Sequence, residues 1–410
     1  MTLEVEGLTH RYGDEPAVDD LSLTVETGEL VALLGPSGCG KTTVVQSVAG
    51  HLQPTDGRVR LRGADVTESP PEARQVGLVF QQSTLYPHMT VGENVAYGLK
   101  ARGVGRDERA ATVEEYLSLV GLDDRRRASP SELSGGQRRR VELARALAPA
   151  PDVLLLDEPL SALDRQLRTQ LRETVGRIQR ETGVTTLYVT HNQEEAMALA
   201  DRLAVMSDGC VSGVGDPRSL YESPPTRFVA SFLGRSNTLP GTVVDRQPLT
   251  VRIGGADVAV VGASAETATG DDVACHVRPE RLSLRPPEGC RMTPAPDPPA
   301  GDAAQAAGGR PDTARQGTDA GGPGSADRHA DAPGRPAAGA GPALSLAGEV
   351  VSVADLGRRY DVTVRLDTGT TVLVECRDQP PAVGDRQAVR VPGRAVTVFP
   401  ARTDGTVSRR

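Results

Sequence analysis

The chain has 410 residues and a formal net charge of −8, and only two of its 46 basic residues, Lys41 and Lys100, are lysines. The acidic balance argues against a nucleic-acid partner, because phosphate backbones bind to basic surfaces. No apolar run approaches the roughly 20 residues that span a bilayer, so we expect a soluble chain. The five cysteines lack metal-ligand or disulfide spacing and are expected to be reduced, cytosolic thiols.

Residues 1–235 alternate between strand-like and helix-like stretches, which predicts an α/β domain. Alternating apolar residues at the N-terminus predict a first strand. Residues 31–34 predict a short buried strand that leads into a glycine-rich loop. Residues 41–50 then predict a helix that ends at Gly50.

The glycine-rich loop matches the pattern Gly-x4-Gly-Lys-[Ser/Thr] between a predicted strand and a predicted helix, which indicates nucleoside triphosphate binding. Its glycines let backbone N–H groups turn toward a β-phosphate, and the helix N-terminus adds partial positive charge. We expect Lys41 to contact the β- and γ-phosphates and the Thr42 hydroxyl to bind Mg²⁺. The predicted ATP-binding residues here are Gly35, Pro36, Ser37, Gly38, Cys39, Gly40, Lys41, Thr42 and Thr43.

Two acids follow a second predicted buried strand, residues 153–156. Asp157 at the strand tip is the expected Mg²⁺ partner. Glu158 is the candidate general base for water, with a salt-bridging glutamate as the alternative. His191 follows the predicted strand 185–190, where it could reach a γ-phosphate.

A second candidate anion site lies in the sequence Leu-Ser-Gly-Gly-Gln at 133–137, just before an arginine-rich predicted helix. Ser134, Gly135 and Gly136 offer hydroxyl and N–H donors at a helix N-terminus. Because the loop 35–42 already serves the chain's own phosphates, the second site is expected to face another molecule. A head-to-tail C2 dimer would then bury two ATP molecules.

From about residue 236 the chain changes to short β-rich runs separated by Gly and Asp, which predicts a small β-barrel or sandwich. Gly270-Asp271 with its following residues resembles Gly384-Asp385, which suggests two related β-units. The predicted strands are 242–244, 249–253, 258–261, 273–277, 349–353, 360–366, 371–375, 388–391 and 395–399.

An Ala-, Gly- and Pro-rich segment, 286–343, separates the two β-units and is almost devoid of large apolar residues. Such a segment buries too little apolar surface to offset its ordering entropy, so we expect it to be disordered. The expected domains are a nucleotide-binding domain at 1–235 and one β-domain in two parts, 236–285 and 344–410.

The set and order of these motifs resemble the nucleotide-binding subunit of an ABC transporter. By that resemblance, Tyr12 matches the aromatic residue that stacks on adenine, and Gln81 the glutamine that links Mg²⁺ to a membrane partner. Residues 133–137 match the signature motif, which contacts the γ-phosphate held by the opposite subunit. Asp164 belongs to the D-loop, and His191 matches the switch histidine.

The resemblance implies a site for ATP and Mg²⁺ that two subunits share. The implied catalytic residues are Glu158, His191, Gln81 and Lys41; the implied Mg²⁺ ligands are Thr42, Gln81 and Asp157; the further ATP contacts are Tyr12, Ser134, Gly135, Gly136, Gln137 and Asp164.

The β-domain, with the sequence His-Val-Arg-Pro-Glu at 276–280, resembles the OB-like TOBE domain of importer ATPases that serve polyamines, ferric iron, thiamine, sugars or sulfate, and the segment 85–91 also resembles that group. The resemblance implies a homodimer or a pair with a paralogous ATPase, on the cytoplasmic face of the membrane. Permease subunits would dock near residues 81–91, and a solute-binding protein would deliver the solute. A polyamine, iron or thiamine-like solute is favoured over a sugar, sulfate or molybdate. An exporter ATPase and a non-transport ABC ATPase remain alternatives.

Three features depart from the usual pattern of that family. Asn192 stands where an aspartate is usual, and Arg138, Arg139 and Arg140 replace a glutamine-rich run. The segment 286–343 splits the β-domain. None of these removes a group expected to act in catalysis.

Overall fold

The computed structural model describes residues 1–161, 163–260, 262–263, 267–286 and 343–401. They divide into two compact units: Glu280–Arg394, and a larger unit of Met1–Pro279 with strand β21 (Val396–Pro400). The segment expected to be disordered, 286–343, lies outside the described residues except at its two end positions.

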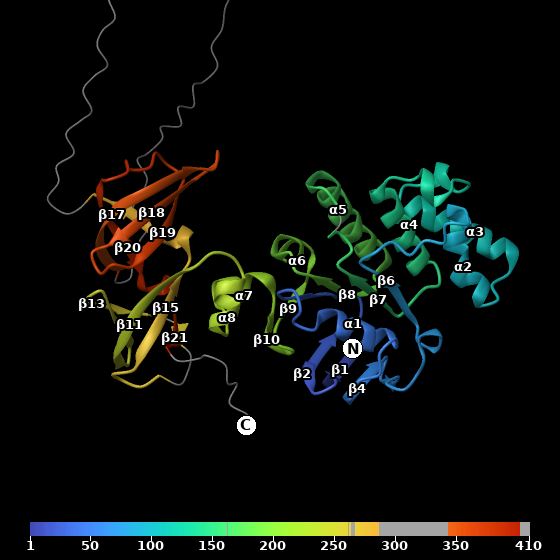
Figure 1. Ribbon diagram of the computed structural model, residues 1–410, viewed down its shortest axis with the longest axis horizontal. Helices are drawn as coiled ribbons and strands as arrows, with labels where there is room; N and C mark the ends of the chain where they lie inside the picture. The colour runs from blue at the N-terminus through green and yellow to red at the C-terminus, as the bar shows by residue number, and fades with distance from the viewer. Residues whose placement is uncertain (162, 261, 264–266, 287–342, 402–410) are drawn as a thin grey trace, which may run out of the picture. The chain divides into compact units, whose positions relative to one another are not determined.

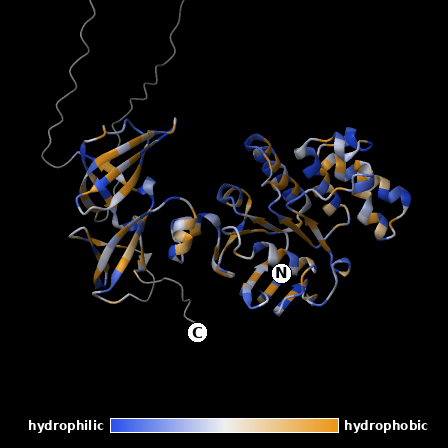
Figure 2. Cartoon of the chain, in the orientation of Figure 1, coloured by the Kyte–Doolittle hydropathy of each residue, from blue (hydrophilic) through white to orange (hydrophobic). Residues whose placement is uncertain are grey.

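The larger unit is built around a six-stranded sheet of order β10-β9-β3-β8-β7-β6, in which all strands except β10 run parallel. Every residue of β3, β7 and β8 is buried. β3 is apolar throughout and β7 is apolar up to its last residue, Asp157 (Figure 2), as is typical of parallel strands covered on both faces. The strands are β3 (Leu30–Leu34), β6 (Val76–Val79), β7 (Val153–Asp157), β8 (Thr185–Thr190), β9 (Arg202–Ser207) and β10 (Cys210–Gly215).

One face of this sheet packs on helix α1 (Lys41–Ala49) and on a second, antiparallel sheet of order β2-β1-β4-β5. Val31 and Leu33 of β3 share this core with Val44 of α1. Helix α1 ends where Gly50 adopts a left-handed φ of 83°, which glycine accommodates without strain. The strands are β1 (Leu3–Tyr12), β2 (Glu15–Val25), β4 (Asp56–Leu61) and β5 (Ala64–Asp65).

The opposite face is covered by helices, and α2, α3 and α4 pack against one another as a group (Figure 1). Leu30, Ala32 and Leu34 of β3 point into this second core. Among the described residues, no helix is both long and apolar enough to cross a bilayer. The helices are α2 (Val91–Ala101), α3 (Arg106–Leu119), α4 (Gly135–Leu147), α5 (Arg165–Thr182), α6 (Gln193–Leu199), α7 (Pro217–Glu222) and α8 (Arg227–Phe232).

Two further sheets carry the β-rich part of the chain. The larger unit contains one of order β13-β12-β11-β15-β21-β14, and Glu280–Arg394 contains one of order β16-β20-β17-β18-β19. The strands are β11 (Asn237–Arg246), β12 (Leu249–Ile253), β13 (Ala256–Ala259), β14 (Gly262–Ala263), β15 (Asp272–Val277), β16 (Ser283–Arg285), β17 (Ala343–Asp355), β18 (Tyr360–Leu366), β19 (Thr371–Cys376) and β20 (Arg386–Pro392).

The internal repeat expected from the sequence has a matching local structure in both sheets. Gly270 and Gly384 each have a φ of 92°, which favours glycine. The carboxylates of Asp271 and Asp385 each accept a hydrogen bond from the amide three residues earlier, at 2.7 and 2.8 Å. The two turns are therefore built by the same residues in the same roles.

His276 on β15 is a buried histidine held between two hydroxyls. Its Nδ1 lies 3.2 Å from Ser236 Oγ, and its Nε2 lies 3.2 Å from Thr238 Oγ1. Because a hydroxyl both donates and accepts, this pair suits a neutral ring with one bare nitrogen. Burial, with the charges of Arg227 and Arg278, lowers the pKa of His276 to about 4.

The stability of the protein should therefore fall as the pH drops from 6.5 toward 4. In that window the unfolded chain takes up a proton at His276 and the folded chain does not, which removes about 2 kcal/mol between pH 7 and pH 5. In His276→Gln the side chain can still form hydrogen bonds but does not titrate. The stability of this variant should therefore decrease less than that of the wild type between pH 7 and pH 5. Denaturant unfolding of both proteins at the two pH values measures it; equal decreases would contradict the assignment.

Candidate functional site

The glycine-rich loop joins the carboxyl end of β3 to the start of α1. Within it the buried Lys41 donates hydrogen bonds from Nζ to the carbonyl oxygens of Gly35 and Pro36, at 2.9 and 2.8 Å. A Cβ on Gly40 would lie 2.2 Å from the carbonyl oxygen of Ala17, so the loop path requires glycine there. The Lys41 ammonium therefore bonds to neutral carbonyl oxygens. A phosphate could replace them, because a hydrogen bond between an ammonium and an anionic oxygen is stronger.

Asp157 ends β7 at the same edge of the sheet and has the chemistry of a magnesium ligand. Its carboxylate is buried, and Oδ1 has no hydrogen-bond partner among the described residues. Burial, with the nearby Glu158 carboxylate, raises the pKa of Asp157, while a hydrogen bond from the Thr42 hydroxyl and the Lys41 charge oppose the shift. A bare buried oxygen beside a hydroxyl fits a hard cation that prefers oxygen ligands.

Glu158 is the centre of a three-residue contact at this edge. Its Oε2 accepts a hydrogen bond from Gln81 Nε2 at 3.1 Å, and its Oε1 lies 3.0 Å from His191 Nδ1. The backbone of Glu158 has a φ of 44°, a strained value for a residue other than glycine. With this backbone conformation the side chain reaches both Gln81 and His191. The structure thus brings together three residues that lie 33 and 77 positions apart in the chain.

The signature segment forms the N-terminus of α4, with Ser134 as the N-cap. The Ser134 hydroxyl accepts from the amide of Gln137 at 3.2 Å, and the Gln137 side chain accepts from the amide of Ser134 at 2.9 Å. Gly135 and Gly136 form the first turn. Both contacts are local, so the segment stands as a capped helix terminus with its free N–H donors directed off the end of α4.

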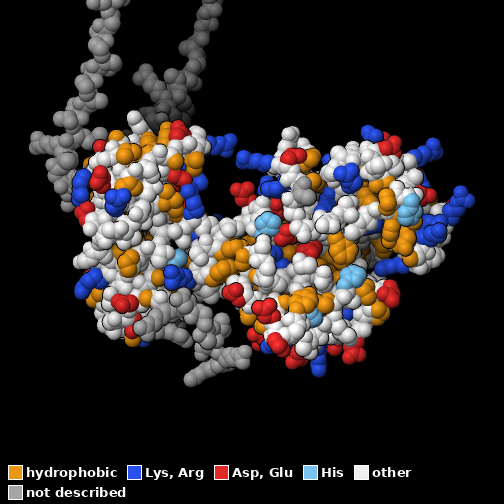
Figure 3. All heavy atoms as spheres, viewed as in Figure 1, with side chains coloured by type: hydrophobic (Ala, Val, Ile, Leu, Met, Phe, Trp, Pro, Cys, Tyr) orange, Lys and Arg blue, Asp and Glu red, His pale blue; other side chains and the backbone are white. Residues whose placement is uncertain are grey.

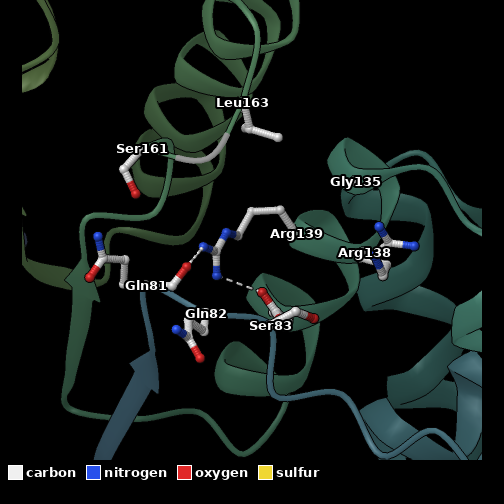
Figure 4. Close-up of a pocket in the computed structure, with 9 residues that line it drawn as sticks. Gln81, Gln82, Ser83, Gly135, Arg138, Arg139, Ser161 and Leu163 are labelled. Carbon is white, nitrogen blue, oxygen red and sulfur yellow. Dashed lines mark hydrogen bonds and ion pairs between the residues drawn. The ribbon is translucent and has the colours of Figure 1, made fainter.

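A cavity of about 580 Å³ lies between the segment Gln81–Ser83, the start of α4 and the segment that leads into α5 (Figure 4). Arg139 extends across it and donates to the carbonyl oxygens of Phe80 and Gln81, at 2.6 and 2.5 Å. It also forms a buried ion pair with Glu142 at 2.7 Å. Sequence reasoning did not identify Arg139 and Glu142 as site residues, although opposite charges three positions apart on a predicted helix were a visible signal.

The remaining predicted residues make local contacts. Tyr12, 57% exposed, ends β1, and its ring meets the ring of His10 edge-on, with centroids 4.7 Å apart. Asp164 caps α5 by accepting from the amide of Leu167 at 3.0 Å. Asn192 caps α6 through its amide oxygen, which a carboxylate would do equally well, so this departure from the family pattern costs the fold nothing visible.

Comparison with known proteins places this geometry in a family. A family profile described as ABC transporter matches residues 18–161, and a TOBE domain profile matches residues 328–399. The spermidine/putrescine import ATP-binding protein PotA of Thermobifida fusca is 48% identical over 287 residues, which cover 69% of this chain and 75% of that protein. The Fe(3+) ions import ATP-binding protein FbpC of Brucella abortus is 44% identical over 286 residues, which cover 69% and 80%.

The chain therefore belongs to the ATP-binding proteins of ABC transporters. It is an ATPase of the importer type, with an ABC ATPase domain followed by a TOBE β-domain. The fold class expected from the sequence is confirmed, and so is the binding of ATP. The roles of the individual site residues stay predictions.

Proposed function

We propose that two copies of this chain clamp two Mg²⁺-bound ATP molecules head to tail and thereby drive a membrane permease for solute uptake. The observation that carries the proposal is the placement of Lys41, Asp157 and Glu158 at one sheet edge, with Glu158 linked to Gln81 and His191. The signature segment supports a shared site, because it is a capped helix N-terminus that offers donors to an anion in addition to the loop that carries Lys41.

Mg²⁺ would be held by the Thr42 hydroxyl, Asp157 and the Gln81 amide oxygen. When bound, it would supply positive charge that stabilises the phosphates while the γ-phosphoryl group is transferred to water. Lys41 would leave the carbonyl oxygens of Gly35 and Pro36 and bind the same phosphates. The orphaned Oδ1 of Asp157 supports this assignment.

Hydrolysis requires Glu158 to accept a proton from water. In the structure both of its carboxylate oxygens have partners, Gln81 for one and His191 for the other. We infer that the γ-phosphate draws these two donors toward itself and frees Glu158 to act as the general base. The arrangement would therefore keep Glu158 from acting as a base until ATP is enclosed in the site.

The permease would dock on the segment that follows Gln81. Hydrophobic side chains gather beside a histidine on the surface over α2 (Figure 3). The rings of Tyr86 and Tyr97 meet at a tilt of 43° with centroids 4.6 Å apart, and the Arg145 guanidinium lies 5.4 Å from the centroid of the Tyr86 ring. The buried Asn94 accepts from the amide of Tyr86 at 2.8 Å and donates to its carbonyl, which fixes the loop. A rigid aromatic surface suits a protein partner.

The wider assembly follows from this proposal. The chain would lie on the cytoplasmic face of the membrane with permease subunits, and a solute-binding protein would deliver a polyamine or ferric iron. Its own domains would be 1–235 and a TOBE domain in two parts, 236–285 and 344–410, around the segment 286–343. The matching turns at Asp271 and Asp385 support the two-part domain.

Reconstitution in vesicles with the permease and solute-binding protein encoded beside its gene tests this function. We expect the binding protein loaded with spermidine or putrescine, or alternatively with Fe³⁺, to raise ATP hydrolysis at least severalfold over the unloaded protein. The solute that stimulates hydrolysis should also accumulate in the vesicle lumen. Efflux of solute, or hydrolysis that ignores a loaded binding protein, would contradict an importer.

A further inference from the structure

Helix α4 holds the backbone of the segment after β6 at several points. Arg139 donates to the carbonyl oxygens of Phe80 and Gln81, while the Glu142 carboxylate accepts from the amide of Thr84 at 2.8 Å. One helix turn on, Arg145 donates to the carbonyl and hydroxyl oxygens of Thr84, at 2.8 and 2.6 Å. The segment 80–84 is therefore fastened at both ends to the helix that begins with the signature.

The Arg139–Glu142 pair is buried, with 8% and 2% of the two side chains exposed. Charge-assisted hydrogen bonds from such a pair are stronger and less yielding than those of an exposed one. Each carboxylate oxygen of Glu142 has its own partner, Arg139 or Thr84. The contacts thus define one geometry for the segment relative to α4.

We propose that Arg139, locked by Glu142, is a positioning residue that makes the segment Phe80–Thr84 and helix α4 move as one rigid body. Gln81 is held by its backbone to Arg139 and by its side chain to Glu158. We call the contacts of Arg139 and Glu142 with this segment the clamp. A displacement of Ser134 at the start of α4 would then move Gln81 through the clamp, and Gln81 would in turn move the Glu158 carboxylate. The inference rests on the proposed roles of Gln81, Glu158 and Ser134.

Helix α4 does not need the Arg139–Glu142 pair in order to fold. The helix buries Val141, Leu143, Ala144 and Leu147 almost completely in the core shared with α2 and α3. Replacement of a buried ion pair by apolar side chains of similar volume is often neutral for stability. The clamp can therefore be removed from a folded protein.

The test compares Arg139→Met/Glu142→Leu with the wild-type full-length chain. We expect kcat for ATP to fall about 10- to 100-fold, as misplaced catalytic groups do, with KM and the ATP dissociation constant within about twofold. Hydrogen exchange at the Thr84 amide should accelerate, which reports that the clamp is open. The matched control is Arg177→Met/Glu181→Leu, an exposed pair on α5 whose arginine also donates to a distant carbonyl, that of Leu119.

A kcat within twofold of wild type, with faster exchange at Thr84, would overturn the inference. Should the double variant fail to fold, Arg139→Lys takes its place. Lysine keeps the positive charge but lacks the planar guanidinium that bonds two carbonyl oxygens at once, so we expect kcat to fall at least about threefold. Unchanged kcat for that variant would also overturn it. Failure of the proposed site itself is distinguishable, because Glu158→Gln would then hydrolyse ATP normally.

Discussion

Glu158→Gln is expected to lower ATP turnover by roughly a thousandfold, the share typical of a positioned general base. Glutamine keeps the size of the side chain and can still meet Gln81 and His191, but it cannot accept the proton of the attacking water. The phosphate loop is untouched, so ATP should still bind. We expect the variant to accumulate as a dimer with ATP enclosed, measured by light scattering and by retained radiolabelled nucleotide.

A matched control for this change is Glu173→Gln, at an exposed position on α5. It makes the same chemical substitution away from the sheet edge and should leave turnover unchanged. Normal hydrolysis by Glu158→Gln would show that another group accepts the proton, and the contact with His191 would then have only a structural role.

Ser134→Arg is expected to abolish turnover while leaving ATP binding by the single chain largely intact. The arginine would occupy the space at the start of α4 where the partner's γ-phosphate is proposed to lie. The chain's own loop, which carries Lys41, is unaffected. Equilibrium binding of a fluorescent ATP analogue to the monomer and steady-state hydrolysis measure the two effects separately.

Loss of the helix cap could by itself weaken the protein by about 1 kcal/mol, so a second variant is needed. Ser134→Asp preserves the cap, since aspartate caps helices as well as serine does, but it places a negative charge toward the incoming phosphate. It should fold as stably as the wild type and still fail to hydrolyse ATP. Should either variant lose ATP binding as a monomer, Ser134 would serve its own chain's nucleotide.

Local patterns predicted much of the fold because they act over a few residues. The strand at 185–190 and the strands at 249–253 and 360–366 have the predicted bounds. Helix α1 starts at Lys41 and ends before Gly50, because the loop glycines and a left-handed cap fix both ends. The two β-units shared a Gly-Asp signal that corresponds to one turn geometry.

Long-range contacts were less accessible to sequence reasoning. The link from Glu158 to Gln81 and His191 depends on which strands lie side by side, and β6, β7 and β8 are neighbours in the sheet although far apart in the chain. The clamp of Arg139 depends on the path of a loop, which has no periodicity to reveal it. The arginine-rich run was visible as a departure from the family pattern, but its partner Glu142 was not connected with it.

The central claim is that each ATP is enclosed by the phosphate loop of one copy and the signature of the other. Mixing Lys41→Ala with Ser134→Arg, two inactive variants, tests it most directly. A head-to-tail dimer of one of each has one intact site, so an equal mixture should recover up to about a quarter of wild-type hydrolysis. If both elements acted within one chain, every site would remain defective. A mixture with no activity, from variants that each fold and associate, would contradict the account.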